Sequence, residues 1–138
     1  MKELFANYDQ SLALKELGFD EPCLGFYERN KELIIQQCEV TDFSTASLQC
    51  IAPTKSQIFK WFRDKHDFSH QISKTRGGQY MPYVNGDTLL DVATEHKVGK
   101  ILIDDKGYKW MYDTYEEAED ACIDKLIELI QLYGIWSH

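Results

Sequence analysis

The sequence predicts an α+β fold in which a mainly antiparallel sheet of about five or six strands packs against two or three helices, the last of them long. Two observations carry this prediction. The segment 114–133 repeats apolar residues every three or four positions, as a helix on a broad apolar surface does. Upstream of it, short segments rich in β-branched and aromatic residues alternate with turn signals, which is typical of strands that could supply such a surface.

The long C-terminal helix is predicted over residues 114–133, TYEEAEDACIDKLIELIQLY. Thr114 and Glu117 have the spacing of a capping box, and further acidic residues suit the positive end of the helix dipole. Gly134 stands where a left-handed residue would end the helix. The apolar face consists of Ala118, Cys122, Leu126, Leu129, Ile130 and Tyr133, widened by Ile123 and Ile127.

Two shorter helices are predicted upstream. The first covers residues 8–17, with Asn7 as its N-cap and Gly18 as its terminator. The second runs from Pro53, a residue that suits a first helical turn, to about His66. The apolar face of this second helix consists of Ile58, Trp61 and Phe62, with Phe59 at its edge.

The predicted strands lie between these helices. They cover residues 23–28, 33–37, 68–75, 80–84, 98–104 and 108–112. Residues 39–52 are predicted to be a loop that could contain a further strand at 48–51. Arg76-Gly77-Gly78 and Asn85-Gly86 are turn signals. Pro82 lacks a backbone donor and therefore favours an edge position or a bulge for its strand. Residues 87–97 fit either a short helix or a strand.

Composition predicts a single domain over residues 1–138 in the cytoplasm. A chain of 138 residues with 43% hydrophobic residues can bury a core without a metal or a disulfide. It has no apolar run long enough to cross a bilayer, so no membrane contact is expected, and its first residues lack the apolar segment of a signal peptide. Cys23, Cys38, Cys50 and Cys122 are scattered and predicted to be reduced packing thiols, with Cys50 the most exposed.

The charge distribution singles out one segment. The net charge is −8, yet residues 51–112 carry ten basic and seven acidic residues. Basic and aromatic residues are interleaved between positions 55 and 76, a pattern that could bind phosphates and stack on bases. The competing interpretation is an ordinary helix with a buried aromatic face and a solvated basic face. The candidate nucleic-acid-binding residues are Lys55, Lys60, Arg63, Lys65, Lys74 and Arg76.

Patterns for catalysis or metal binding are weaker. His66 and His70 have a spacing that suits zinc on one helix, but the predicted helix ends between them. A Cys–His nucleophilic pair lacks any recognisable motif. The acidic pair Asp104-Asp105 is better explained as a hairpin turn, and a carboxylate cluster within 87–97 as a solvated face. The sequence therefore predicts no catalytic residue, no metal site and no cofactor.

Two resemblances concern the setting of the protein. YKWMYDTYEEAEDAC is similar to the end of the arm-type DNA-binding domains of phage integrases, where a strand precedes a helix that begins Thr-x-x-Glu-Ala. The basic residues that this resemblance implies on the sheet are present in part, as Lys100, Lys106 and Lys109. LALKELGFDEPC, IFKWFRDKH and TYEEAEDACIDKLIEL resemble a family of small proteins, without an assigned function, encoded in phages and mobile elements of gut bacteria. That resemblance implies a phage-related setting and no catalytic residue.

The functional expectation is a non-enzymatic, soluble binding or accessory protein that acts through contacts with a host protein, a phage protein or a second copy of itself. The alternative is a nucleic-acid-binding protein that uses the basic segment 55–76. A hydrolase or thiol enzyme ranks third.

Overall fold

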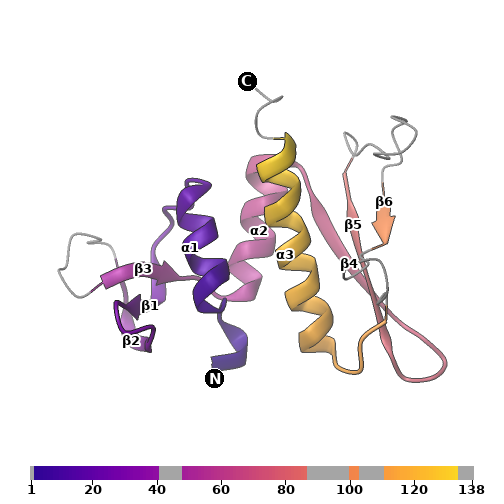
Figure 1. Ribbon diagram of the computed structural model, residues 1–138, viewed down its shortest axis with the longest axis horizontal. Coiled ribbons are helices and arrows are strands. Elements are labelled where there is room, and N and C mark those ends of the chain that lie inside the picture. The colour runs from indigo at the N-terminus through magenta and orange to yellow at the C-terminus, as the bar shows by residue number, and fades with distance from the viewer. Residues whose placement is uncertain (1, 41–47, 87–99, 103–110, 134–138) are drawn as a thin grey trace. The chain divides into compact units, whose positions relative to one another are not determined.

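The computed structural model describes residues 2–40, 48–86, 100–102 and 111–133, which form an α+β fold (Figure 1). The chain divides into two compact units, residues 1–58 and residues 59–138, here called the N-terminal and C-terminal units. The boundary falls within helix α2, Lys55–His66. Each unit contains helical residues and antiparallel strands, so the α+β class is confirmed. The single domain expected over residues 1–138 stays a prediction.

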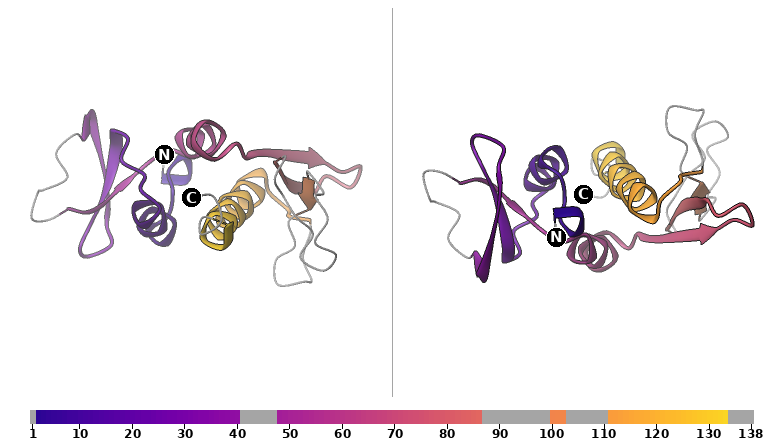
Figure 2. Two further views of the ribbon diagram at one scale, coloured as in Figure 1. Left: turned by 90° about the horizontal axis from the view of Figure 1, so that it is seen from above. Right: turned by 90° about the horizontal axis from the view of Figure 1, so that it is seen from below.

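The N-terminal unit combines a helix with a three-stranded antiparallel sheet. Its elements are the 3-10 helix η1 (Lys2–Leu4), helix α1 (Tyr8–Glu16) and strands β1 (Cys23–Glu28), β2 (Leu33–Val40) and β3 (Leu48–Ala52). β1 is the central strand, in the order β2-β1-β3. Helix α1 packs against β3, and Figure 2 shows it on one side of this sheet.

Both ends of α1 follow from the residues at its termini. The Asn7 side chain accepts a hydrogen bond of 2.8 Å from the Gln10 N–H, and the Gln10 side chain accepts one of 3.1 Å from the Asn7 N–H. This reciprocal pair is a capping box, as predicted. After the last turn, Gly18 adopts φ +96°, and its N–H donates to the Lys15 carbonyl. Only glycine takes that left-handed conformation without steric cost.

The core of the N-terminal unit is built on a close approach between backbone and ring. Gly25 in β1 lies beneath Phe5: a Cβ at this position would stand 3.0 Å from the Phe5 ring and 3.1 Å from the Ala52 carbonyl oxygen. Tyr27 donates a buried hydrogen bond of 2.7 Å to the Ala6 carbonyl. Phe5, Tyr27, Cys50 and Ala52 form a cluster against which Tyr8, Leu12, Leu33 and Ile35 pack.

The C-terminal unit places the longest helix on a second sheet. It contains the larger part of α2, strands β4 (Ser69–Lys74), β5 (Tyr80–Asn85) and β6 (Lys100–Leu102), and helix α3 (Tyr115–Tyr133). These strands are antiparallel in the order β4-β5-β6, and α3 packs on β5 and β4. Thr114 caps α3 by accepting a hydrogen bond of 3.1 Å from the Glu117 N–H. The predicted inward face of α3 is buried at Ala118, Cys122, Ile123, Leu126, Ile127, Leu129 and Ile130.

The division into two sheets corrects the prediction of one. The described strands form two three-stranded sheets, one on each side of α2 in the sequence. Pairing between neighbouring strands closes the shortest loops and so loses the least chain entropy. The sequence pattern identified the strands but contained no signal for which distant strands would join.

Two proline predictions are also corrected. Helix α2 begins at Lys55 rather than Pro53, because Thr54 is the N-cap: its hydroxyl accepts a hydrogen bond of 3.2 Å from the Gln57 N–H. Pro82 lies in β5, the central strand of its sheet, without a bulge in its pairing with β4. Tyr80 bonds through its backbone to Tyr112 on the side of β5 away from β4. Because alternate residues point the same way, the Pro82 nitrogen also faces away from β4 and costs that ladder no bond.

Several predictions fall outside the described residues. They are the segment 87–97 with its acidic residues, the strand positions 98–99, 103–104 and 108–110, the pair Asp104-Asp105, Lys106, Lys109 and the cap at Gly134.

Candidate functional site: the β4–β5 hairpin and the basic residues around it

The six candidate basic residues do not form one surface. Lys55 belongs to the N-terminal unit and is buried, with 6% of its surface exposed, which removes it from any surface that would contact phosphates. The other five lie in the C-terminal unit and are exposed. They occupy two places: Lys60, Arg63 and Lys65 on α2, and Lys74 and Arg76 at the β4–β5 turn.

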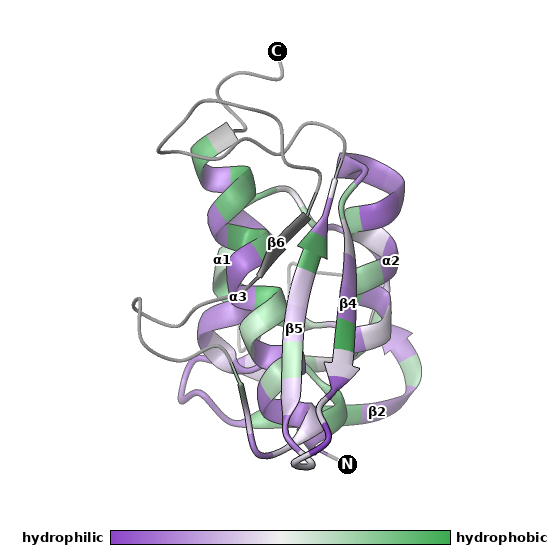
Figure 3. Ribbon diagram, turned by 90° about the vertical axis from the view of Figure 1, so that its right-hand side faces the viewer, coloured by the Kyte–Doolittle hydropathy of each residue, from purple (hydrophilic) through white to green (hydrophobic). Residues whose placement is uncertain are grey.

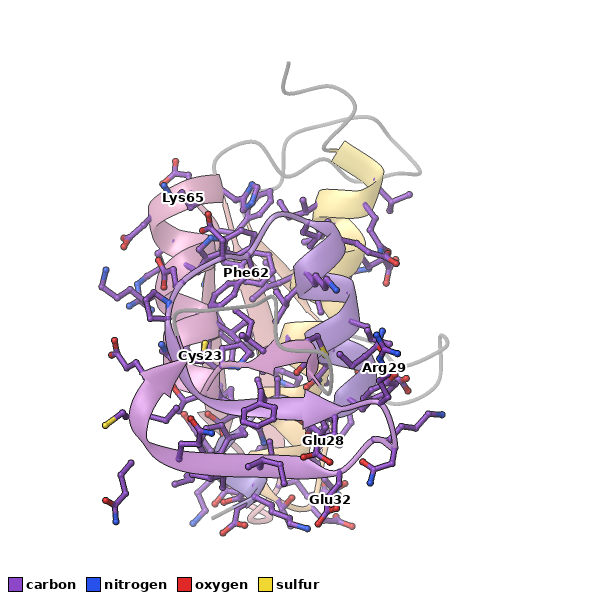
Figure 4. All side chains as sticks on the ribbon, turned by 90° about the vertical axis from the view of Figure 1, so that its left-hand side faces the viewer. Cys23, Glu28, Arg29, Glu32, Phe62 and Lys65 are labelled. Atoms are coloured by element: carbon purple, nitrogen blue, oxygen red, sulfur yellow. The ribbon has the colours of Figure 1, made fainter. Side chains whose placement is uncertain are left out.

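The cations of α2 are partly occupied within the helix. Lys60 forms an ion pair of 2.6 Å with Asp64, one helical turn away. This hydrogen bond from Lys60 is the main cause that lowers the pKa of the Asp64 carboxyl. Lys65 is exposed near the end of the same helix, whereas Phe62 is fully buried (Figure 4). The basic face is therefore the solvated side of a helix whose other side is core.

The β4–β5 turn is a tight three-residue loop. The Thr75 N–H donates a hydrogen bond of 2.7 Å to the Gln79 carbonyl, and the Gly78 N–H donates one of 3.1 Å to the Thr75 carbonyl. Gly78 closes the loop with φ +84°. Lys74 lies next to this loop with its ammonium 5.9 Å from the centre of the Tyr80 ring, at the outer limit of a cation–π contact. Lys74 and Arg76 thus lie at the turn end of the hairpin.

The aromatic residues between these cations are not available for stacking on a base. Phe59, Trp61 and Phe68 are each 4% exposed, and Phe62 is fully buried. Trp61 instead packs edge-on against Phe62 and His66, with ring centres 5.1 and 4.9 Å apart. The interpretation of these aromatics as core residues is therefore confirmed.

His66 and His70 are each held against aromatic rings. His70 is stacked on Phe59, with 3.5 Å between ring centres, and its buried Nδ1 has no hydrogen-bond partner. Burial lowers the pKa of both imidazoles, and the positive charge of Arg63 adds to the effect at His70. Asp67, with φ +60°, separates the end of α2 from β4. In the described part of the chain, no group of three or more His, Cys, Asp and Glu side chains is arranged to hold a metal ion.

Three of the four thiols are core groups. Burial raises the pKa of Cys23 and Cys122 to about 12 and that of Cys50 to about 11, which keeps these thiols protonated at neutral pH. The expectation that Cys50 would be the most exposed thiol is wrong, because β3 turns it towards the core under α1. Cys38 on β2 is the exposed cysteine.

The second face of the β4–β5 hairpin was not predicted from the sequence. His70 meets Phe59 of α2, and Tyr80 meets Tyr115 of α3, so both helices lie on the face to which these alternate residues point. The residues that alternate with these along β4 and β5 point to the opposite face of the hairpin, which is turned towards the viewer in Figure 3. That face carries Ser69, Gln71, Ser73, Met81, Tyr83 and Asn85. We call these six residues the outer sheet face.

The outer sheet face is polar without being charged. Gln71 is exposed, the other five residues are partly exposed, and Gln71 donates a hydrogen bond of 3.4 Å to the Ser73 hydroxyl. The alternation of Ser69, Gln71 and Ser73 with apolar residues was the available sequence signal, but one strand alone does not reveal a surface.

Comparisons with protein-family models, with curated proteins and with solved structures each found no match to this chain. None of the described helices combines the length and the apolar character that crossing a bilayer requires.

Proposed function

We propose that this protein is a non-enzymatic binding or accessory protein that acts in the cytoplasm, in a phage or mobile-element setting, through contacts with another protein. The outer sheet face is the observation that carries the proposal. In a chain with 28% charged residues, β4 and β5 present there only uncharged side chains that can hydrogen-bond or pack. Such faces suit protein contacts, because charged residues are costly to desolvate and are depleted at interface cores.

The rest of the C-terminal unit supports a role as a scaffold for that face. Helix α3 buries its apolar side on β5 and β4, and its exposed side carries acidic residues such as Glu116, Asp124 and Glu128. Cys122 is turned inward and donates to the Tyr83 carbonyl over 3.8 Å. These contacts fix the sheet from behind, so that the outer sheet face is presented on a rigid support.

The alternative partner is nucleic acid, bound by Lys60, Arg63, Lys65, Lys74 and Arg76. Their common exposure in the C-terminal unit favours it. The burial of Trp61 and Lys55 and the Lys60–Asp64 ion pair weaken it, since they remove a stacking ring and occupy two cations. The net charge of −8 repels a polyanion at long range.

The decisive experiment is affinity purification from the native host, followed by mass spectrometry, with a matched pair of variants. Gln71→Glu combined with Ser73→Glu places two charges on the outer sheet face. Glu116→Lys combined with Asp124→Lys changes two charges on α3 instead. We expect a partner protein that the α3 variant retains and the sheet variant loses. A partner that both variants retain would contradict the assignment of the outer sheet face.

A salt titration distinguishes nucleic-acid binding from protein binding. Binding to a 20-base oligothymidine and to a 20-base-pair duplex is measured by fluorescence anisotropy between 50 and 300 mM salt, conditions under which phosphate contacts give a steep loss of affinity, on the order of tenfold or more. We expect no binding at the lowest salt. Tight binding with a steep salt slope, lost on Arg76→Glu, would replace protein by nucleic acid as the partner.

A further inference from the structure

Strand β4 is an edge strand with one side of its backbone unused. Its only pairing in the described structure is with β5. The Thr75 N–H bonds to Gln79, so every second residue before Thr75 also bonds to β5. The residues between them, His70, Ile72 and Lys74, therefore direct their N–H and C=O groups away from the sheet. No hydrogen bond to these groups is present among the described residues.

The corresponding edge of the N-terminal unit is protected, whereas β4 is not. β2 pairs with β1 at Leu33–Ile35 and again at Val40, and the register shifts between these two points. An irregularity of this kind prevents another strand from pairing along an edge. β4 pairs regularly at all six of its residues and contains no proline. Its backbone is consequently a straight template for strand addition.

The turn end of this edge carries two cations. Residues 68–86 contain Lys74 and Arg76 and no acidic residue, although the whole chain has 23. Both cations are exposed. The start of β4 follows the exposed Asp67, so the cationic end of the unused backbone is the turn end, at Lys74 and Arg76.

We propose that the outer edge of β4 binds an extended acidic segment of a partner protein by β-strand addition. This inference rests on the proposed function and names the partner's chemistry. The N–H and C=O groups of His70, Ile72 and Lys74 pair with the partner's backbone. An acidic side chain of the partner that lies opposite Lys74 meets the cationic turn end of the edge.

A second copy of this chain is a poorer occupant of the same edge. If two β4 strands paired antiparallel about Ile72, each Lys74 would lie opposite His70 of the other copy, so neither copy would supply an acidic side chain opposite Lys74. An acidic partner segment supplies that charge.

The test selects a displayed library of random decapeptides on the intact protein and resynthesises the enriched peptides. We expect enrichment of proline-free sequences that contain Asp or Glu. Affinity should fall about threefold on Lys74→Ala, through loss of charge, and about fivefold further on Lys74→Pro, which also removes the outward N–H. In the enriched peptides, backbone N-methylation should abolish binding at one set of alternate residues, whose N–H groups face β4, and should have little effect at the other set. Lys31→Glu, in the hairpin of the N-terminal unit, is the charge control and should leave affinity unchanged.

The remaining outcomes overturn the inference in distinguishable ways. Peptides that bind with no sensitivity to Lys74→Pro would remove β4 as the site and leave a protein-binding function intact. Enrichment of basic peptides, or of none, would remove the acidic partner. Competition by a 20-base oligothymidine that is lost on Lys74→Glu would overturn the proposed function as well. Thermal melts of each variant must match the parent within about 3 °C, and Lys74→Glu replaces Lys74→Pro if proline prevents folding.

Discussion

The hairpins of the two units share one backbone design and differ in the residue that takes the left-handed position. In the C-terminal unit, residues 75–79 close a three-residue loop. In the N-terminal unit, the Glu28 N–H donates 3.1 Å to the Glu32 carbonyl and the Lys31 N–H donates 2.9 Å to the Glu28 carbonyl, which is the same pair of bonds. Figure 4 shows Glu28, Arg29 and Glu32 gathered at this turn. The left-handed position is Gly78 in one loop and Lys31, with φ +68°, in the other.

The sheets behind these hairpins differ more. In the N-terminal unit, Tyr27 faces α1 and its neighbour Phe26 points to the opposite face, yet the two are only 7% and 9% exposed. Both faces of that sheet are thus apolar and buried at β1. In the C-terminal unit, the helices bury one face of the hairpin and the other is polar. The same local design therefore yields one sheet whose residues serve stability and another that keeps a face for recognition.

The largest predicted effect tests whether the two units unfold together. Leu14 on α1 and Leu126 on α3 are each 1% exposed. Leu→Ala at either position should lower the free energy of unfolding by about 3 kcal/mol, because it removes buried methyl groups and leaves a cavity. If residues 1–138 are one domain, both variants shift a single urea transition by the same amount.

Two separate unfolding transitions would contradict the prediction of a single domain. A transition that splits in two, with Leu14→Ala moving only the first part and Leu126→Ala only the second, would show that the units fold independently. Tryptophan fluorescence reports the C-terminal unit alone, because Trp61, Trp110 and Trp136 all belong to it, whereas far-ultraviolet circular dichroism reports both units.

The second prediction concerns glycines that serve different purposes in the two units. Gly25→Ala should destabilise the protein by about 1–3 kcal/mol, because its Cβ would be pressed between the Phe5 ring and the Ala52 carbonyl at 3.0 and 3.1 Å. Gly77→Ala is the matched control, since its nearest neighbour is the Thr75 hydroxyl at 3.8 Å. Urea denaturation measures both. Equal effects would mean that the ring moves aside and that the close approach is not required.

The third prediction exploits the difference between the hairpins at the left-handed position. Gly78→Lys should cost about 1 kcal/mol, because a side chain in the left-handed region clashes with its own backbone. Lys31→Gly should raise the free energy of unfolding. The increase should be smaller than about 1 kcal/mol, because the substitution also removes the cation–π contact of Lys31 with Tyr8 at 5.3 Å. Effects of the same sign in urea denaturation would show that loop conformation does not govern these hairpins.

Local features of the fold could be predicted from the sequence, and long-range ones could not. The capping box at Asn7, the left-handed Gly18 and the extent of α3 depend on residues a few positions apart, and all agree with the structure. The partition into two sheets depends on which strands meet, for which the sequence has no local signal. Pro82 was misjudged because its effect depends on which side of β5 its nitrogen faces.

The candidate site was predictable only in part. Lys74 was predicted at the end of a strand and Arg76 in the turn that follows it, and the structure exposes both. Lys55 was misplaced because a lysine at a helix start is as compatible with a buried stem as with a solvated one. The edge of β4 was not recognised, since an unused backbone edge is a property of strand order and not of residue type.

The smallest predicted effect is an acid sensitivity confined to one unit. All four histidines lie at positions 66, 70, 96 and 138, hence in the C-terminal unit. Because burial lowers the pKa of His66 and His70 below the usual 6.5, the unfolded chain binds more protons than the folded one just below that pH. Stability should be complete above pH 6.5 and decrease as the pH falls through the folded-state values.

Two variants assign this acid sensitivity. His70→Phe keeps a ring stacked on Phe59 and cannot titrate, so its melting temperature should fall less than that of the parent between pH 7.5 and 5.5. Arg63→Gln removes the cation that opposes protonation of His70 and should also reduce the fall. Carboxylates contribute little in this window because they titrate mainly below pH 5. An identical pH dependence in all three proteins would exclude His70 as the source of the acid sensitivity and leave His66 as the histidine whose pKa burial lowers.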